Sequence, residues 1–160
     1  NSRGLRTYHQ DCANNDSHTG EMFDSATFLY AFGHIADRKN RVKSLKKINS
    51  YLKDGSPFYL DLFSLNNINE WGPLTLKYFE DKNLGKYGYE KGDVFYKKRG
   101  FSELAFLHYF EFSEIVALLS DTGFKIEWIK YIGYSKNPGQ IVDSEREGNF
   151  LIKAIKIKSN

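Results

Sequence analysis

Cysteine, long apolar runs and an excess of one charge are nearly absent from this sequence of 160 residues. The single cysteine, Cys12, excludes a disulfide within the chain and suits a reducing compartment, so we predict a cytoplasmic location. No apolar run approaches the roughly 18 residues that a membrane span needs, and no signal peptide is visible, which argues against a membrane partner. Basic and acidic residues number 23 and 20 and are interspersed, so the composition gives no indication of a nucleic-acid partner.

Common catalytic and metal-binding motifs are missing as well. The sequence has no nucleophile elbow, no P-loop and no arrangement of a catalytic triad. His9, His18 and His108 lack partners at the spacing of metal ligands, and Cys12 lacks a second thiol. We therefore predict that the protein binds no metal.

What is present is a strand, a helix and a strand in succession. Residues 23–32 form an apolar run with little alternation, which is typical of a strand covered on both faces. A helix is predicted over residues 37–52 and a second strand over residues 56–63. Such a βαβ unit winds right-handed and gives a parallel pair of strands. Because ligands of open α/β sheets bind at the carboxyl ends of the strands, we expect the functional site at residues 29–34 and 61–66.

The helix of this unit has clear boundary signals. Asp37 is the predicted N-cap, and Gly55 stands where a left-handed C-cap residue is expected. One apolar stripe faces the core, formed by Val42, Leu45, Ile48 and Leu52. The basic residues of the other faces are predicted to be solvated, namely Lys39, Arg41, Lys43, Lys46 and Lys47.

The middle of the chain, residues 65–112, mixes glycine, asparagine and aromatic residues. We predict a short helix and a loop that closes over part of the molecule. Residues 93–98 and 101–112 follow as two strands around Arg99 and Gly100, which favours an antiparallel hairpin.

The end of the chain predicts one more helix and two closing strands, with a short strand also expected at residues 4–9. Ser113 is the predicted cap of the helix, which ends at Gly123. The closing strands cover residues 124–134 and 149–158. The loop of about fourteen residues between them is too short for a crossover helix, so the two strands are predicted to be antiparallel.

In this order the elements resemble the class I S-adenosylmethionine-dependent methyltransferases, in the branch that acts on small molecules. The resemblance covers nearly the whole chain and rests on the stretches TYHQDCAN, FDSATFLYAFGHIADR, LKKINSYLKDGSPFYLDLFS, HYFEFSEIVALLSDTGFKI and GNFLIKAIKIK. They match an Asp after the family's third strand, a Phe-Asp that opens the fourth and Leu-Lys-x-Gly before the fifth. They also resemble the family's Phe-Ser-x-x-Glu-like start of the last helix and match Gly-Phe before the sixth strand. The resemblance implies an α/β, Rossmann-like sheet with an antiparallel last strand, S-adenosylmethionine as cofactor and a small-molecule substrate.

The family's glycine-rich loop, which holds the methionine end of the cofactor, is not matched. No Gly-x-Gly-x-Gly occurs in the sequence. The resemblance thus starts at about the third strand, and residues 1–160 are expected to be the C-terminal part of a single methyltransferase domain with an insertion at about 65–112. The sheet is then incomplete, with its first two strands missing, and the chain is expected to be inactive alone. An upstream half of the same domain or a homo-oligomer partner is expected to complete the site.

Four residues match cofactor-binding positions of the family. The resemblance implies that Asp11 accepts from the adenine amino group and that the backbone of Cys12 lies near a ring nitrogen. Asp11 serves equally well as a loop residue in an Asx turn. Leu29 and Tyr30 match the end of the family's fourth strand, beside the methionine portion of the cofactor. Alternatively, both residues belong to the core of the strand, a role that suits the apolar Leu29 better than Tyr30.

The resemblance also implies an acceptor pocket. Gly33 and His34 lie in the turn that faces the substrate, where His34 would orient the acceptor or take its proton. A capping or exposed loop histidine remains an alternative. Asp61 and Asn66 follow the next strand and are expected to contact the substrate. An aromatic lid over a small apolar or cationic acceptor is predicted from Trp71, Tyr78, Tyr87, Tyr89 and Tyr109, which can also be core residues of the insertion.

Three functions remain open from the sequence. The first is transfer of a methyl group from S-adenosylmethionine to a small molecule. The second is a non-catalytic Rossmann-like lobe that binds a partner or serves as a scaffold. The third is part of another α/β enzyme, such as a nucleotide-dependent oxidoreductase, which predicts a last strand parallel to its neighbours.

Overall fold

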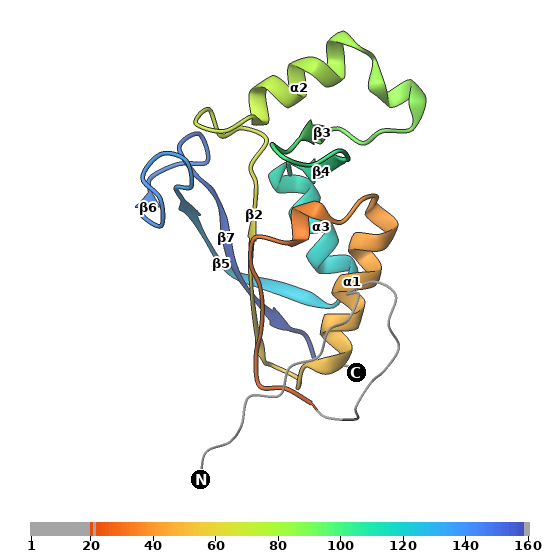
Figure 1. Ribbon diagram of the computed structural model, residues 1–160. Coiled ribbons are helices and arrows are strands. Elements are labelled where there is room, and N and C mark those ends of the chain that lie inside the picture. Colours follow the sequence, from red (N-terminus) through yellow and green to blue (C-terminus); the bar gives the residue numbers. More distant parts are fainter. Residues whose placement is uncertain (1–19, 21, 159–160) are drawn as a thin grey trace.

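The computed structural model describes residues 20 and 22–158 and contains two sheets and helices of two kinds (Figure 1). The strands are β1 (Ala26–Phe28), β2 (Pro57–Leu62), β3 (Asp93–Lys97), β4 (Leu104–His108), β5 (Phe124–Ile132), β6 (Ile141–Val142) and β7 (Asn149–Lys156). The α-helices are α1 (Arg38–Tyr51), α2 (Gly72–Asp81) and α3 (Phe112–Asp121), and the 3-10 helices are η1 (Phe32–His34) and η2 (Leu84–Tyr87).

The main sheet has the strand order β1-β2-β7-β5-β6. Strand β1 is parallel to β2, with Ala26 opposite Phe58, as the βαβ pattern predicts. Strand β7 is antiparallel to both of its long neighbours, β2 and β5. The predicted antiparallel closing pair is therefore confirmed, and the oxidoreductase alternative, which requires a parallel last strand, is wrong.

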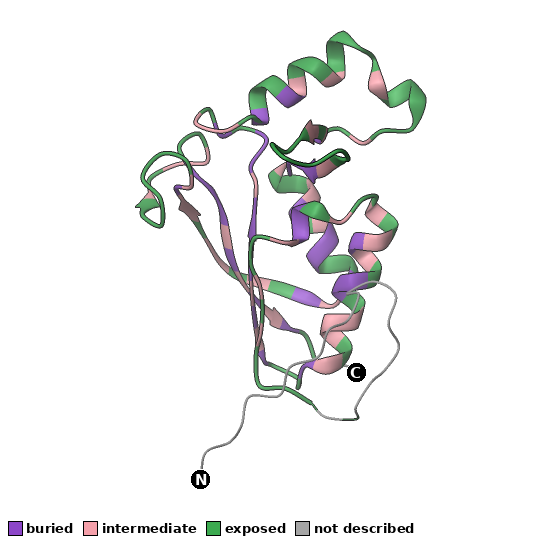
Figure 2. Ribbon diagram, viewed as in Figure 1, coloured by how far each residue is buried: buried purple, intermediate pink, exposed green. Residues whose placement is uncertain are grey.

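Helices α1 and α3 cover one face of the main sheet (Figure 1). The core between them is formed by side chains of the central strands and of the two helices, including Leu45, Phe58, Leu60, Ile115, Leu118, Phe150 and Ile152. In Figure 2 the buried residues follow β2 and β7 and the sides of α1 and α3 that face the sheet. Burial of these apolar side chains is the main force that holds the two helices on the sheet.

The first strand is shorter than predicted. Only Ala26–Phe28 pairs with β2, because Tyr30 adopts a left-handed backbone with φ 55° and the chain then enters η1. A left-handed residue ends a strand, since its backbone groups no longer point along the ladder. The apolar run beyond this point therefore does not mark a longer strand: Leu29 and Tyr30 are exposed, and Phe32 packs in the main core from η1.

Two boundary predictions and one burial prediction are also corrected by the structure. Gly55 has φ 77° but lies in a turn beyond the helix, whose C-cap is Leu52. Ser113 lies inside α3, which has Glu111 at its N-cap. Arg41, predicted to be solvated, is fully buried. The predicted N-cap of α1 is confirmed, because the Asp37 carboxylate accepts from the backbone N–H of Asn40 at 2.7 Å.

We call the segment between β2 and α3, residues 63–111, the insertion; it forms a layer of its own beyond the carboxyl end of β2 (Figure 1). It contains α2, η2 and the two-stranded sheet β3-β4, whose antiparallel pairing confirms the predicted hairpin. A second core cluster, centred on Leu65, Leu107 and Tyr109, lies under this layer. Within the described residues, none of the helices has the length and apolar character that crossing a membrane requires.

Candidate functional site

Tyr30 and Asp61 meet at the carboxyl ends of β1 and β2. The backbone N–H of Tyr30 donates to Oδ1 of Asp61 at 2.7 Å, although 31 positions separate the two residues. Tyr30 is an aromatic residue in the left-handed region, a conformation that costs of order 1–2 kcal/mol and recurs at functional sites. The buried carboxylate of Asp61 compensates for this strain by accepting the hydrogen bond.

Tyr134 is the third member of this cluster. Its hydroxyl donates to Oδ2 of Asp61, and its ring stacks on that of Tyr30 with centroids 4.6 Å apart. Burial, followed by the hydrogen bond to Asp61 and the Asp61 charge, raises the pKa of Tyr134 far above its ordinary value. Burial and the same charge also raise the pKa of Tyr30. Both phenols therefore stay protonated at neutral pH.

The sequence predictions included Tyr30 and Asp61 but missed Tyr134. A signal for it did exist: β5 and β2 are both antiparallel to β7, so they are parallel to each other. Tyr134 follows β5 directly, and carboxyl ends of parallel strands meet at one edge of a sheet.

The outer surface of this cluster is open. Leu29 is 48% exposed and Tyr30 is 60% exposed, so an apolar and an aromatic side chain lie uncovered at the end of β1. Exposed apolar groups next to a strained backbone are typical of a ligand-contacting surface rather than of a strand core.

Gly33 and His34 lie in η1 and join it to β4. A Cβ at Gly33 would lie 3.0 Å from Cδ1 of Leu107 and 3.2 Å from the carbonyl of His108, so this glycine allows η1 to approach the hairpin closely. The exposed His34 donates from Nδ1 to the carbonyl of Phe106 at 2.8 Å. Since a carbonyl can only accept, the neutral ring has its lone pair on Nε2.

Asn66 lies beyond β2 at the same edge. Its side-chain amide donates to Oε1 of Glu145 at 2.8 Å, and its backbone N–H donates to the hydroxyl of Ser64. The exposed Asn66 therefore ties the end of β2 to the loop that precedes β7.

The two remaining predicted substrate residues, Trp71 and Tyr109, differ in how far they are exposed. Trp71, at the start of α2, is half exposed and lines a cavity of about 570 Å³ between α2, η2 and the β3-β4 hairpin. Tyr109 is buried in the core of the insertion, against Phe63. Burial raises the pKa of Tyr109 to about 12. Tyr109 is therefore a core residue of the insertion, whereas Trp71 lies at the surface, where a lid residue is expected.

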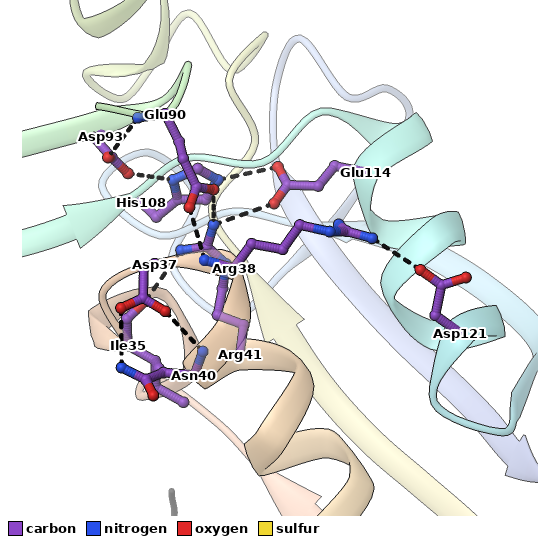
Figure 3. Close-up of polar contacts among 10 residues, drawn as sticks. All are labelled: Ile35, Asp37, Arg38, Asn40, Arg41, Glu90, Asp93, His108, Glu114 and Asp121. Carbon is purple, nitrogen blue, oxygen red and sulfur yellow. Dashed lines mark hydrogen bonds and ion pairs between the residues drawn. The ribbon is translucent and has the colours of Figure 1, made fainter. Parts of the chain in front are cut away.

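A buried ionic network holds the insertion on α1 and α3 (Figure 3). His108 on β4 bonds through Nδ1 to Asp93 at 2.7 Å and through Nε2 to Glu114 at 3.0 Å. Burial lowers the pKa of His108, but the hydrogen bonds to Asp93 and Glu114 outweigh it and raise the pKa above its ordinary value. Since both ring nitrogens face carboxylates, the imidazolium form fits this site.

Arg41 of α1 completes the network. Its guanidinium pairs with Glu90 of the insertion, lies 3.5 Å from Glu114 and donates to the carbonyl of Ile35 at 3.1 Å. The Glu90 carboxylate also accepts from the backbone N–H of Arg38 at 2.7 Å. Charges buried in this way are retained only when they are paired.

Glu90, His108 and Glu114 place ligand atoms within 4.8 Å of one another, which the sequence did not suggest. The arrangement nevertheless differs from a metal site, because the cationic Arg41 lies among the carboxylates and both imidazole nitrogens are engaged. The absence of a metal stays a prediction. Asp11 and Cys12 lie outside the described residues, and their predicted roles stay predictions too.

Comparison with known proteins gives matches in structure only. No protein-family model and no curated protein matches the sequence. An S-adenosylmethionine-dependent methyltransferase of Methanosarcina mazei superposes with a TM-score of 0.66 at 22% identity, over 94% of this chain and 66% of its own. One of Clostridium acetobutylicum gives 0.59 at 16% identity, over 98% of this chain and 66% of its own.

A third match is the 1,6-didemethyltoxoflavin-N1-methyltransferase of Burkholderia thailandensis, with a TM-score of 0.55 at 13% identity. It is covered over 48% of its length, by 92% of this chain. The chain thus spans from about half to just under two thirds of the length of these three proteins. The strand order, the antiparallel β7 and these superpositions agree: the chain has the fold of the class I S-adenosylmethionine-dependent methyltransferases.

Proposed function

We propose that this protein transfers a methyl group from S-adenosylmethionine to a small-molecule acceptor. The observation that carries the proposal is the cluster of Tyr30, Asp61 and Tyr134 at the carboxyl edge of a methyltransferase-type sheet. Ligands of open α/β sheets bind at this edge. The strained backbone of Tyr30 is held by a carboxylate and a stacked ring, an arrangement that a purely structural strand end does not need.

The residues at the end of β1 fit the methionine part of the cofactor. Leu29 and Tyr30 offer an uncovered apolar and aromatic surface, and Asp61 keeps the Tyr30 backbone in place from beneath. Asp11 and Cys12 are proposed to bind the adenine. We also propose that residues 1–160 are the C-terminal part of a single domain with an insertion at about 65–112. The protein is proposed to be cytoplasmic.

S-adenosylmethionine supplies, when bound, a methyl carbon that its positively charged sulfur already activates. The chain therefore needs to align the acceptor and exclude water rather than supply a strong base. Tyr30 and Tyr134 stay protonated, so they add no competing anionic nucleophile to this edge.

His34 is proposed as the residue that orients the acceptor or receives its proton. Its Nδ1 is held by the Phe106 carbonyl, which leaves the Nε2 lone pair as the acceptor. Asn66, Trp71, Gly33 and Tyr109 are proposed to shape the acceptor pocket, Gly33 and Tyr109 by packing beneath it.

Calorimetry with S-adenosylhomocysteine tests the proposal on the full-length protein that contains these residues. We expect saturable binding that Tyr30→Ala weakens by about 3- to 10-fold, the loss of one aromatic contact. Phe112→Ala is the matched control, because Phe112 is an aromatic residue of α3 that is 48% exposed and lies outside the cluster. Its affinity should equal that of the unaltered protein.

Two results would contradict the proposal. Failure of the full-length protein to bind S-adenosylhomocysteine would favour the non-catalytic lobe. Equal weakening by both substitutions would show that the cofactor does not contact the end of β1.

A further inference from the structure

The cavity in the insertion has the dimensions of a small-molecule site. It holds about 570 Å³, within the roughly 300–1,000 Å³ that is usual for ligand pockets. One wall comes from α2 and η2 and the other from β3 and the start of β4. Its lining is aromatic and aliphatic, and includes Trp71, Leu74, Tyr78, Tyr89, Phe95 and Leu104.

The rings that line the cavity are fixed but uncovered. Tyr89 meets Phe95 edge to face with centroids 5.6 Å apart, and Trp71 meets Tyr96 in the same manner at 5.6 Å. Trp71, Tyr89 and Phe95 each remain 42% to 50% exposed. Because the edge-to-face contacts fix the ring planes, the exposed faces form a rigid surface on which a planar molecule can stack.

The charges around the cavity decide which molecule fits. Asp93 is the one ionisable carboxylate among the described lining residues, and no lysine or arginine lines the cavity in this part of the chain. Both oxygens of Asp93 are engaged, Oδ1 with Nδ1 of His108 at 2.7 Å and Oδ2 with the backbone N–H of Glu90 at 2.9 Å. A ligand ammonium would therefore lose its hydration without gaining a counterion, and a ligand carboxylate would do the same.

A series of ring contacts links the insertion to the sheet edge. Tyr109 contacts Phe63 with centroids 5.5 Å apart, Phe63 contacts Tyr134 at 5.2 Å, and Tyr134 stacks on Tyr30 at 4.6 Å. Trp71 contacts Tyr96, which packs against the cluster that contains Tyr109. The wall of the cavity and the residue proposed to contact the cofactor thus belong to one packed aromatic unit.

We propose that this cavity binds a neutral, planar, ring-containing molecule, and, resting on the proposed function, that this molecule is the methyl acceptor. The hydroxyls of Thr75, Tyr78 and Tyr89 are the polar groups that can orient its substituents. An aromatic lid can bind an apolar or a cationic acceptor. Because both oxygens of Asp93 are already hydrogen-bonded, this cavity favours the apolar acceptor.

Calorimetry with three probes of one ring system tests this assignment at pH 7. The probes are 1-naphthalenemethanol, which is neutral, 1-naphthylmethylamine, which is a cation, and 1-naphthoate, which is an anion. We expect the neutral probe to bind at least about tenfold more tightly than either ion. Trp71→Ala should weaken its binding several-fold, and the Phe112→Ala control should not.

A second variant adds a charge to the cavity lining instead of removing a side chain from it. Leu74→Glu changes a residue of α2 that is largely exposed, so the fold should tolerate it. It should weaken the neutral probe and strengthen the ammonium, whereas Val116→Glu, at an exposed apolar position of α3, should change neither.

Several results would overturn the assignment. These are binding of the ammonium or the carboxylate as tightly as the neutral probe, no binding of any probe at about 1 mM, or affinities that Trp71→Ala and Leu74→Glu leave unchanged. The titrations contain no S-adenosylmethionine. Their failure therefore counts against this cavity alone, and failure to bind S-adenosylhomocysteine counts against methyl transfer.

Discussion

At the scale of single residues, the strained Tyr30 shows how the site is held. Its left-handed backbone costs of order 1–2 kcal/mol, and a stacked ring together with a charge-assisted hydrogen bond offsets this cost. Asp61 receives one hydrogen bond on each oxygen, from Tyr30 and from Tyr134. The carboxylate is therefore the link between the ends of β1, β2 and β5.

Tyr134→Phe tests this link. The substitution keeps the stacked ring but leaves Oδ2 of the buried Asp61 without its donor, so we expect the free energy of unfolding to fall by about 1–3 kcal/mol. Urea denaturation at pH 7 measures the change. Tyr78→Phe, at an exposed tyrosine of α2, is the control and should have almost no effect. A loss as small as the control's would mean that water replaces the hydroxyl.

At the scale of elements, the ionic network decides how the insertion is attached. Arg41 of α1 reaches Glu90, and Glu114 of α3 reaches His108 of β4, so both helices of the main layer hold the insertion. Each of these pairs joins residues that are buried or half-buried. Removal of one partner leaves an uncompensated charge beneath the insertion.

His108 gives this attachment a pH dependence. Because its folded-state pKa lies above the ordinary 6.5, its contribution to stability is complete below about pH 6.5 and is lost as the pH rises through the folded value. We expect the free energy of unfolding to fall as the pH rises above about 6.5, and to fall less in His108→Gln. Urea denaturation over this range measures the difference. An equal fall in both proteins would mean that His108 is neutral when folded.

At the scale of the whole molecule, the two layers differ in how they are stabilised. Strand β7 lies between two strands, and most of its residues are buried. Helix α2 contributes few buried residues, and its outer side faces solvent (Figure 2). Local opening should therefore be much easier in the insertion than in the main sheet.

Amide hydrogen exchange tests this difference between the layers. The amides of β7 and β2 should exchange most slowly, near the rate set by global unfolding, and those of α2 and η2 should exchange far faster. Mass spectrometry of peptides from the two regions measures both rates. Saturating S-adenosylhomocysteine should slow exchange at the end of β1. Protection of α2 equal to that of β7 would contradict the layered picture.

Local sequence patterns are sufficient to predict the order and direction of the main elements. The helix after Asp37, the parallel pair around it, the hairpin in the insertion and the antiparallel closing strands all follow from local patterns and loop lengths. Periodicity and turn residues act over a few positions, so a single sequence records them.

Which polar side chains meet depends on long-range packing that local patterns do not record. Tyr134 reaches Asp61 across 73 positions, and Arg41 reaches Glu90 across 49. A lysine or arginine on an amphipathic helix is usually solvated, and nothing near Arg41 in the sequence distinguishes it from its neighbours. Its burial depends on where the insertion folds back, and the strain at Tyr30 depends on a carboxylate from another strand. Long-range packing fixes these contacts, because their partners come together only once the sheet and the insertion have formed.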